Sequence, residues 1–196
     1  MSKHPPLDAH REQTLLAAAV RDDDAFRQLY DAYLPPIYAY VGYRVGSRDD
    51  AEDIVAETFA RMARGLGRFR WRGPGSFSAW LFRIAHNEVA GYYRRRARAA
   101  PDVGLNAVED APDARPLPEQ AAESTERRRR MRQLVAALPP RRQEVVLLKF
   151  FGGLSNHEIA AILGLNERTV ASHLCRALDD LERRWPEAAG EGGFIP

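Results

Sequence analysis

The chain has 196 residues, of which 45% are hydrophobic, so it is long and apolar enough for one or two cored domains. Its single cysteine, Cys175, excludes an internal disulfide framework and a zinc site built from several thiolates. The net charge is only +2, no run of about 18 apolar residues occurs, and residues 1–10 lack the apolar core of a signal peptide, so we expect a cytoplasmic protein without membrane insertion.

Charge is divided into blocks along the chain. Residues 22–57 carry nine acids against three arginines, and residues 61–98 carry ten arginines against one acid. Residues 102–126 are acidic again, with seven acids against one arginine. Such alternation predicts surfaces with different partners: a basic surface for nucleic acid and acidic surfaces for something else.

The first block is predicted to be helical. Apolar residues recur at three- and four-residue spacing in residues 26–37, 49–66 and 80–89. Asp49 or Asp50 is placed to cap the second of these helices. No alternating pattern of useful strand length appears in the sequence, so we expect no sheet.

Aromatic and basic residues interleave at the end of this block. Rings stack on unpaired bases and arginines follow phosphates, and residues 73–76 form a loop that is able to hold an extruded base. We therefore expect contact with single-stranded DNA. The alternative, in which Phe77, Trp80 and Ile84 pack as ordinary helix core, stays open but does not account for the arginine excess. The interleaved residues are Phe69, Arg70, Trp71, Arg72, Phe77, Trp80, Phe82, Arg83, His86, Tyr92, Tyr93, Arg94, Arg95 and Arg96.

The helical period fails between about residue 97 and residue 124. Four prolines fall there among Asp, Glu and Ala, a composition that favours a flexible acidic linker over a long ordered loop. We place this linker at residues 99–126, between a first domain at residues 10–98 and a second at residues 127–186. The Gly-rich residues 187–196 are expected to be a disordered tail.

The second domain is predicted to hold a helix-turn-helix. After the prolines at 139–140, Ser155 stands three residues before Glu158, which is the capping-box arrangement. Gly164 suits the left-handed conformation at the end of a helix, and Asn166 is placed to cap the next one.

One face of this second helix is apolar, and the opposite face would enter the major groove of DNA. Arginines read guanine edges or hold phosphates, and Ser and Thr do either more weakly. Plain helical hairpins share part of this spacing, so the motif alone leaves that alternative open. The outward residues are Arg168, Thr169, Ser172, His173 and Arg176.

Four strings in register carry a family resemblance. They are residues 50–59 (DAEDIVAETF), residues 80–87 (WLFRIAHN), residues 138–146 (LPPRRQEVV) and the helix-turn-helix. In this order, and separated by an acidic linker, they resemble the extracytoplasmic function (ECF) group of sigma factors. The resemblance covers about residues 24–98 and 138–185. It implies an all-α protein of two small helical domains: a helical bundle similar to sigma region 2 and a helix-turn-helix domain similar to sigma region 4.

The resemblance also implies a function. The chain would direct core RNA polymerase to specific promoters and initiate transcription, with Asp50, Asp53 and Glu57 docking on polymerase. The first domain would melt and hold the −10 element as a single strand, and the second would read the −35 element as duplex. Asn87 matches a position of base recognition, and the arginine run beginning at Arg94 looks like a contact with the duplex backbone. The expected −10 contacts are Arg72, Ser76, Phe77, Trp80, Arg83, Asn87, Arg94 and Arg95.

This interpretation assigns no catalytic residue, no metal and no cofactor to the chain. Its expected partners are core RNA polymerase and promoter DNA, as duplex and as single strand, and an anti-sigma factor is a further candidate. One alternative is a stand-alone helix-turn-helix transcriptional regulator, which would not need the aromatic and basic first block. A metal-dependent nuclease is the other, but its carboxylates, Asp49, Asp50, Asp53 and Glu57, lie mostly along one helix and would not enclose a metal.

Overall fold

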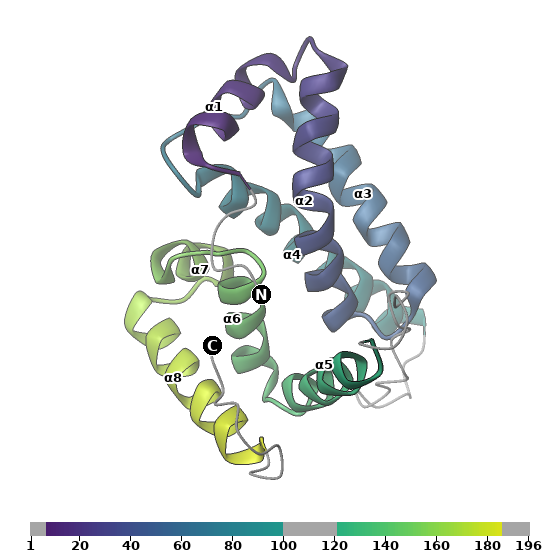
Figure 1. Ribbon diagram of the computed structural model, residues 1–196, viewed down its shortest axis with the longest axis vertical. Coiled ribbons are helices and arrows are strands. Elements are labelled where there is room, and N and C mark those ends of the chain that lie inside the picture. Colours follow the sequence, from purple (N-terminus) through teal and green to yellow (C-terminus); the bar gives the residue numbers. More distant parts are fainter. Residues whose placement is uncertain (1–6, 100–120, 186–196) are drawn as a thin grey trace.

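The computed structural model describes residues 7–99 and 121–185, and the secondary structure in these ranges is helical throughout. Helices α1 to α4 form one group and α5 to α8 a second (Figure 1). The predicted all-α chain of two helical domains is confirmed. The bounds of the helices are α1 Ala9–Ala18, α2 Asp23–Arg44, α3 Arg48–Leu66, α4 Ser76–Ala99, α5 Ala121–Ala136, α6 Pro140–Phe150, α7 Asn156–Leu163 and α8 Glu167–Arg184.

The start of α3 differs from the prediction. Ser47 is its N-cap, and the Ser47 side chain accepts a hydrogen bond from the backbone N–H of Asp50. The prediction that Asp49 or Asp50 caps this helix is therefore wrong. Both acids instead lie in the first turn, where their charge is favoured by the positive end of the helix dipole.

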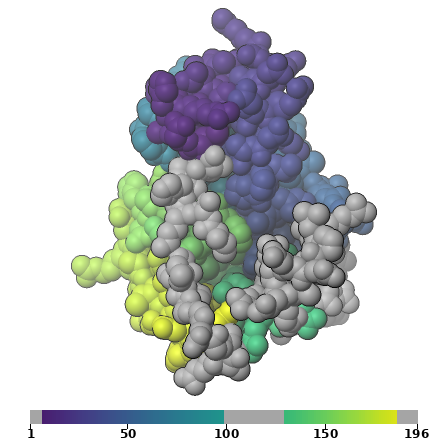
Figure 2. Space-filling model, in the orientation of Figure 1, coloured from purple at the N-terminus to yellow at the C-terminus, as the bar shows by residue number. Residues whose placement is uncertain are grey.

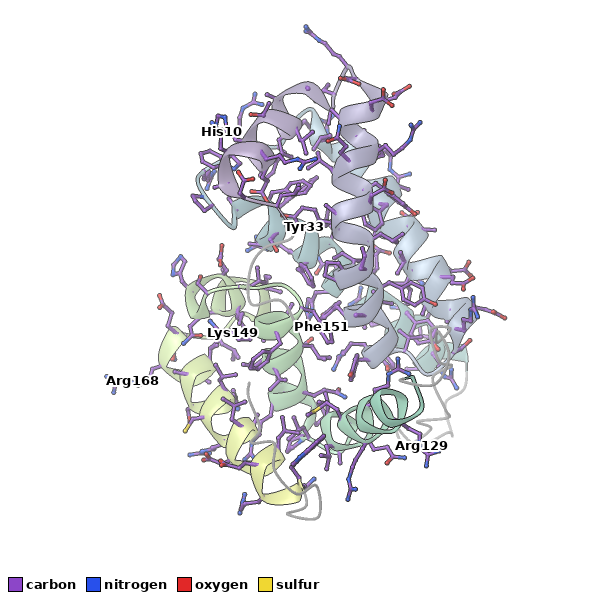
Figure 3. All side chains as sticks on the ribbon, viewed as in Figure 1. His10, Tyr33, Arg129, Lys149, Phe151 and Arg168 are labelled. Carbon is purple, nitrogen blue, oxygen red and sulfur yellow. The ribbon has the colours of Figure 1, made fainter. Side chains whose placement is uncertain are left out.

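Aromatic side chains fill the core of the first domain. Tyr33 and Tyr40 on α2 meet Phe77 and Phe82 on α4 edge to face, with ring centroids 5.0 and 5.5 Å apart, and all four residues have no exposed surface. Figure 3 shows Tyr33 inside this group of helices. Burying each such ring contributes about 1.5–3 kcal/mol to folding, so α2 and α4 are held in a fixed relation.

The second domain has a separate set of aliphatic core residues on α6, α7 and α8. Val145, Leu148, Ile159 and Val170 all have no exposed surface. Pro140 occupies the first turn of α6, because a proline there loses no helical hydrogen bond.

The segment between the domains is shorter than predicted. Helix α4 extends to Ala99 and α5 begins at Ala121, so both enter the range 99–126 that we expected to be linker. Residues 100–120 and the expected tail at 187–196 lie outside the described residues.

The two domains pack against each other. The rings of Tyr43 on α2 and Phe151 after α6 lie 5.2 Å apart, and the guanidinium of Arg132 on α5 lies 6.0 Å from the Tyr43 ring centroid. The hydroxyl of Ser78 on α4 donates to the carbonyl oxygen of Gly152 at 2.7 Å. The space-filling view shows the described surfaces of the two groups adjoining (Figure 2).

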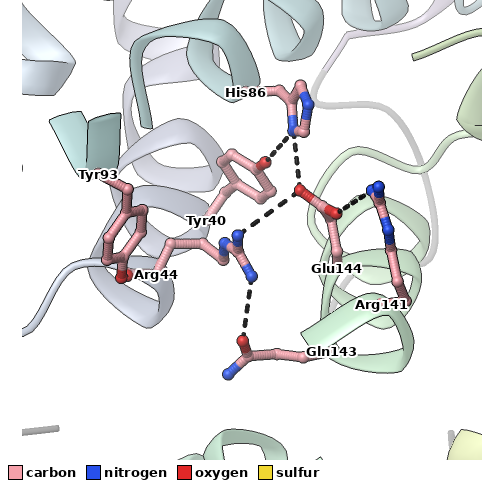
Figure 4. A network of polar contacts seen from close by, with 7 residues as sticks. All are labelled: Tyr40, Arg44, His86, Tyr93, Arg141, Gln143 and Glu144. Carbon is pink, nitrogen blue, oxygen red and sulfur yellow. Dashed lines mark hydrogen bonds and ion pairs between the residues drawn. The ribbon is translucent and has the colours of Figure 1, made fainter. Parts of the chain in front are cut away.

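A polar network centred on Glu144 also joins the domains (Figure 4). Glu144 on α6 is 4% exposed, and its Oε1 lies 2.8 Å from His86 Nδ1 and 3.6 Å from Arg44 Nη2 on the first domain. Its Oε2 lies 3.2 Å from Arg141. Burial alone would raise the pKa of the Glu144 carboxyl, but the His86 hydrogen bond and the charges of Arg44, His86 and Arg141 outweigh burial and lower it.

Candidate nucleic-acid interface

The helix-turn-helix has the local geometry that its sequence predicts. Ser155 caps α7, and the Glu158 carboxylate accepts the Ser155 backbone N–H at 2.7 Å, which completes the capping box. Gly164 ends α7 at φ +67° in the left-handed region, where a Cβ is disfavoured. Asn166 then caps α8 by accepting the backbone N–H of Thr169 at 2.8 Å.

The five predicted contact residues on α8 lie on its accessible side, called here the α8 face: Arg168, Thr169, Ser172, His173 and Arg176. Arg168, Ser172 and Arg176 are exposed, whereas Thr169 and His173 are half-buried. Arg168 points outward at the beginning of α8 (Figure 3). The Thr169 hydroxyl donates to Asn166 Oδ1 at 2.8 Å, so only its oxygen lone pairs remain for DNA.

The C-terminal half of α8 is tied to α6 through Asp180. Its carboxylate accepts hydrogen bonds from Arg142 on α6 and from Arg183 one turn later. Burial would raise the pKa of the Asp180 carboxyl, but the two arginines outweigh burial and lower it. The ion pairs of Asp180 with these two arginines therefore orient α8. They also neutralise the negative charge of Asp180, which would otherwise repel DNA phosphates.

Some of the predicted contact residues of the first domain share one side of helix α4. Ser76, Trp80, Arg83, Asn87 and Arg94 follow one another at intervals of four, three, four and seven residues, which places them on one side of a helix with 3.6 residues per turn. We call this side the α4 face. Arg83, Asn87 and Arg94 are exposed on it, and Trp80 and Ser76 are half-buried.

Phe77 does not belong to this face. It has no exposed surface and packs against Phe69 and Trp80, with ring centroids 5.5 and 5.7 Å away. A ring without accessible surface cannot stack on a base, so the prediction of a DNA contact from Phe77 is wrong. The alternative of helix core holds for this residue, because its position on α4 turns it towards α2.

The loop before α4 is braced at two points. The Ser76 hydroxyl donates to the Gly73 carbonyl oxygen at 2.6 Å and accepts the exposed Arg72 backbone N–H at 3.2 Å. Deeper in the protein, Glu12 on α1 is 1% exposed, accepts the Tyr33 hydroxyl hydrogen, and lies 3.4 Å from Trp71 Nε1. Burial, followed by the Glu12 contact, raises the pKa of the Tyr33 hydroxyl. Sequence reasoning missed Glu12. Its position one helical turn before the apolar residues Leu15 and Leu16, on the same face, indicated that it would be buried.

The three acids predicted to bind polymerase line one groove of about 710 Å³ between α3 and the end of α4. Asp50 accepts the Tyr92 hydroxyl hydrogen at 3.0 Å, and Glu57 lies 2.9 Å from Arg61 and 2.8 Å from Arg64. The Arg61 hydrogen bond is the main cause that lowers the pKa of Glu57. Asp53 is exposed, and the described residues show no hydrogen bond or ion pair to it.

The α4 side of this groove carries two arginines, Arg95 and Arg96, and one acid, Glu88. Arg61, on the α3 side with the three acids, lies 2.8 Å from Glu88. Arg95, predicted as a DNA contact, thus lies beside the acids and away from the α4 face, while Arg94 stays on that face. The acidic and basic blocks of the sequence did not predict that acids and arginines line the same groove.

No group of three or more His, Cys, Asp or Glu in residues 7–99 and 121–185 is arranged to hold a metal ion. In the same ranges, none of the helices has the length and apolar character needed to cross a membrane.

Comparisons with known proteins match both domains. Residues 29–99 match the model of sigma-70 region 2, and residues 128–181 match that of sigma-70 region 4. The chain is 36% identical to the ECF RNA polymerase sigma factor BldN of Streptomyces coelicolor over 88% of this chain, but spans 64% of that relative. It is 30% identical to the RNA polymerase sigma factor YlaC of Bacillus subtilis, over 86% of this chain and 96% of that one.

The chain belongs to the ECF group of RNA polymerase sigma factors. A solved structure of the sigma factor RpoE in complex with the anti-sigma factor NepR from Bartonella quintana matches it with a TM-score of 0.63 and 25% identity, over 81% of this chain and 94% of that one. The chain spans less than two thirds of the length of BldN, and nearly all of YlaC.

The family regions correspond to the two groups of helices. Region 2 covers most of α2 and all of α3 and α4, including the groove and the α4 face. Region 4 covers most of the described second domain, including the α8 face. Helix α1 and its buried Glu12, which lies 3.4 Å from Trp71 in the loop before α4, are outside the matched region 2.

Proposed function

We propose that this chain directs core RNA polymerase to specific promoters and starts transcription there. Region 4 would read the −35 element through the α8 face, and region 2 would hold one strand of the melted −10 element on the α4 face. The observation that carries the proposal is the presence of two polar, arginine-bearing helix faces on separate domains, beside a groove lined by acids. A regulator that only binds duplex needs the α8 face alone.

The α4 face supports strand capture by its composition. Trp80 offers a half-exposed ring, while Arg83 and Arg94 supply positive charge along the same side as Asn87. Unstacking a base costs a few kcal/mol, and stacking on an aromatic side chain returns roughly 1–3 kcal/mol per base. The balance favours strand separation only when several such contacts form together, as they would on this face.

The groove supports polymerase docking because one of its acids is uncommitted. Asp50 and Glu57 are held by Tyr92, Arg61 and Arg64, whereas Asp53 is exposed. We expect Asp53→Ala to weaken binding to core polymerase about fivefold, the loss of roughly one rim ion pair. Asp49→Ala is the matched control, because Asp49 is exposed on the same helix but does not line the groove. Equal affinities of the two variants would contradict this assignment.

Reconstitution with core polymerase and a pool of promoter DNA tests the whole proposal. The expected result is open complexes that form only when chain and core enzyme are both present, enriched in particular upstream and −10 sequences. Tight, sequence-specific duplex binding by the chain alone, with no effect of core enzyme, would establish the stand-alone regulator in its place.

A further inference from the structure

The loop before α4, residues 70–75, has a backbone that is costly to order. Gly73 and Gly75 have positive φ angles of +118° and +81°, and glycine loses more conformational freedom on folding than any other residue. The loop is anchored at its beginning by the ring of Phe69 and at its end by the hydrogen bonds of Ser76. A base gains fully from contact with such a loop only if the loop is ordered beforehand, because ordering it on binding would weaken the affinity.

Trp71 holds the middle of this loop. Its indole is half-buried, and its Nε1 lies 3.4 Å from Oε2 of Glu12 on α1. Figure 1 shows the loop between α3 and α4 running beside α1. Trp71 directly precedes Arg72, which is exposed, as is Pro74. The hydrogen bond to Glu12 therefore fixes the place from which the exposed part of the loop begins.

Glu12 is an acid at a position where stability alone favours an apolar residue. It is 1% exposed, and its described partners are two neutral donors, the Tyr33 hydroxyl and the Trp71 indole. Burying a carboxylate without a paired cation is costly, and the positive end of the α1 dipole offsets only part of that cost. What the carboxylate adds is two acceptor oxygens, which bind one donor from the core and one from the loop at the same time.

We propose that Glu12 is a positioning residue for strand capture: by accepting the Trp71 indole hydrogen, it keeps residues 72–75 in the shape that holds an extruded base of the −10 strand. This inference rests on the proposed function and deepens it, because it needs this loop to bind a base. Glu12 is too deeply buried to touch DNA and acts through Trp71. Without it the loop keeps the charge of Arg72 for phosphates and loses the fixed wall against which a base packs.

Four substitutions separate this role from a general role in stability. Glu12→Leu removes the acceptor and leaves an apolar side chain of similar size, and Trp71→Phe keeps a ring and removes the indole N–H. Tyr33→Phe is the matched control, because it removes the other hydrogen bond of the same carboxylate, on the core side. Glu12→Gln is the conservative variant: its amide oxygen still accepts from Trp71, while its amide nitrogen donates to the Tyr33 oxygen.

The experiment uses the full chain assembled with core polymerase. The probe is a dye-labelled single strand with the −10 sequence that the promoter pool enriches, together with copies of it that carry an abasic site at one position at a time. Fluorescence anisotropy gives the dissociation constant of each strand. The ratio of the constants for the abasic and the intact strand measures the contact with that base, and we expect a ratio of about tenfold at the extruded position, within the range for one stacked base.

Glu12→Leu and Trp71→Phe are each expected to lower this ratio from about tenfold to about twofold. The double variant should lower it no further, because both changes remove the same hydrogen bond. Tyr33→Phe and Glu12→Gln should keep the wild-type ratio, and all variants should bind the abasic strand alike, since phosphate contacts dominate there.

A ratio that falls equally in Tyr33→Phe overturns the inference, because the loss would then follow from stability, and so does a ratio that falls in none of the variants. If Glu12→Leu does not fold by circular dichroism, Trp71→Phe compared with Tyr33→Phe and Glu12→Gln decides the question. Failure of the proposed function has another signature: the wild-type chain with core polymerase enriches no −10 sequence and binds no strand.

Discussion

The helix faces of α8 and α4 both carry arginines, but they stand in different surroundings. The α8 face is open to solvent, and its supporting residues are fixed by caps within the same domain. The α4 face lies opposite Ser78, which contacts the second domain, and its helix also carries Phe77 and Phe82 of the aromatic core of the first domain. Duplex recognition needs a rigid helix that is ready to enter a groove, whereas strand capture needs a ring and positive charges along one side of a helix.

The largest expected effect is a loss of stability at Phe77, which distinguishes this core residue of α4 from the contact residues on the same helix. Phe77→Ala should lower the free energy of unfolding by roughly 3–5 kcal/mol, because the residue is fully buried against Tyr33, Phe69 and Trp80. Denaturant unfolding measures this loss. Phe77→Leu, which keeps most of the volume, should fold and bind single strands as the wild-type chain does.

Trp80→Ala, on the same helix, is expected to affect strand binding more than stability. Trp80 is half-buried, so the variant should keep more stability than Phe77→Ala but lose roughly 1–3 kcal/mol of strand binding for each base that stacks on it. Fluorescence anisotropy with a dye-labelled pool of single strands measures this loss. Strand affinity that falls for Phe77→Leu and not for Trp80→Ala would reverse the roles that the fold gives these two rings.

Substitutions on the α8 face are expected to change DNA sequence recognition and to leave the stability of the fold unchanged. Arg168→Ala and Arg176→Ala should each weaken recognition of the −35 element by about 1–3 kcal/mol without changing unfolding, because both side chains are exposed. Arg184→Ala, at the other end of α8, is the matched control. Transcription lost equally from every promoter, with reduced affinity for polymerase, would instead give the two arginines a structural role.

Glycine-to-alanine substitutions should change stability in opposite directions in the two domains. Gly164→Ala should destabilise region 4 by about 1–2 kcal/mol, because φ is +67° at the turn of the helix-turn-helix. Gly42→Ala in the last turn of α2 should stabilise region 2 by up to about 0.5 kcal/mol, because a Cβ there meets nothing within 4 Å. Thermal unfolding gives both signs, and a loss of stability for both variants would show that Gly42 has a packing role.

Local patterns predicted local structure well. The capping box at Ser155, the left-handed Gly164 and the cap at Asn166 each depend on a few neighbouring residues, so the sequence contains the whole cause. The family resemblance was confirmed by comparisons that cover both regions. Helical spacing also distinguishes Phe77 from Ser76 and Trp80, so the error at Phe77 came from grouping residues by chemistry without placing them on the helix.

Contacts between distant segments could not be predicted in the same way. Glu12 meets Tyr33 and Trp71, and Glu144 meets His86 and Arg44, only because several helices come together in space. Glu144 stood inside a recognised string of region 4, but nothing in that string says that a basic site on region 2 receives it. Long-range polar partners depend on how the helices pack, and a spacing rule does not contain that information.

The smallest expected effect is a pH response of the contact between the two domains. Burial opposes ionisation of Glu144, but His86, Arg44 and Arg141 face it and lower the pKa of its carboxyl below the ordinary 4.5, and Tyr40 lies beside His86. When the domains separate, the pKa of this carboxyl returns towards 4.5. The stabilisation of the domain contact by Glu144 is therefore fully present above that value and is lost as pH falls below it.

Spin labels on Cys175 of α8 and on Ala63→Cys of α3 report the distance between the domains. From about pH 7 down to about pH 4 this distance should lengthen near the acid end in the folded chain that keeps Glu144. Glu144→Gln should show the longer distance at every pH, which separates this carboxyl from the others that titrate in the same range. An equal acid-induced change in both proteins would assign the response to other acids. Contact between the domains would then depend on Tyr43 with Phe151 and on Ser78 with Gly152, which carry no titrating charge.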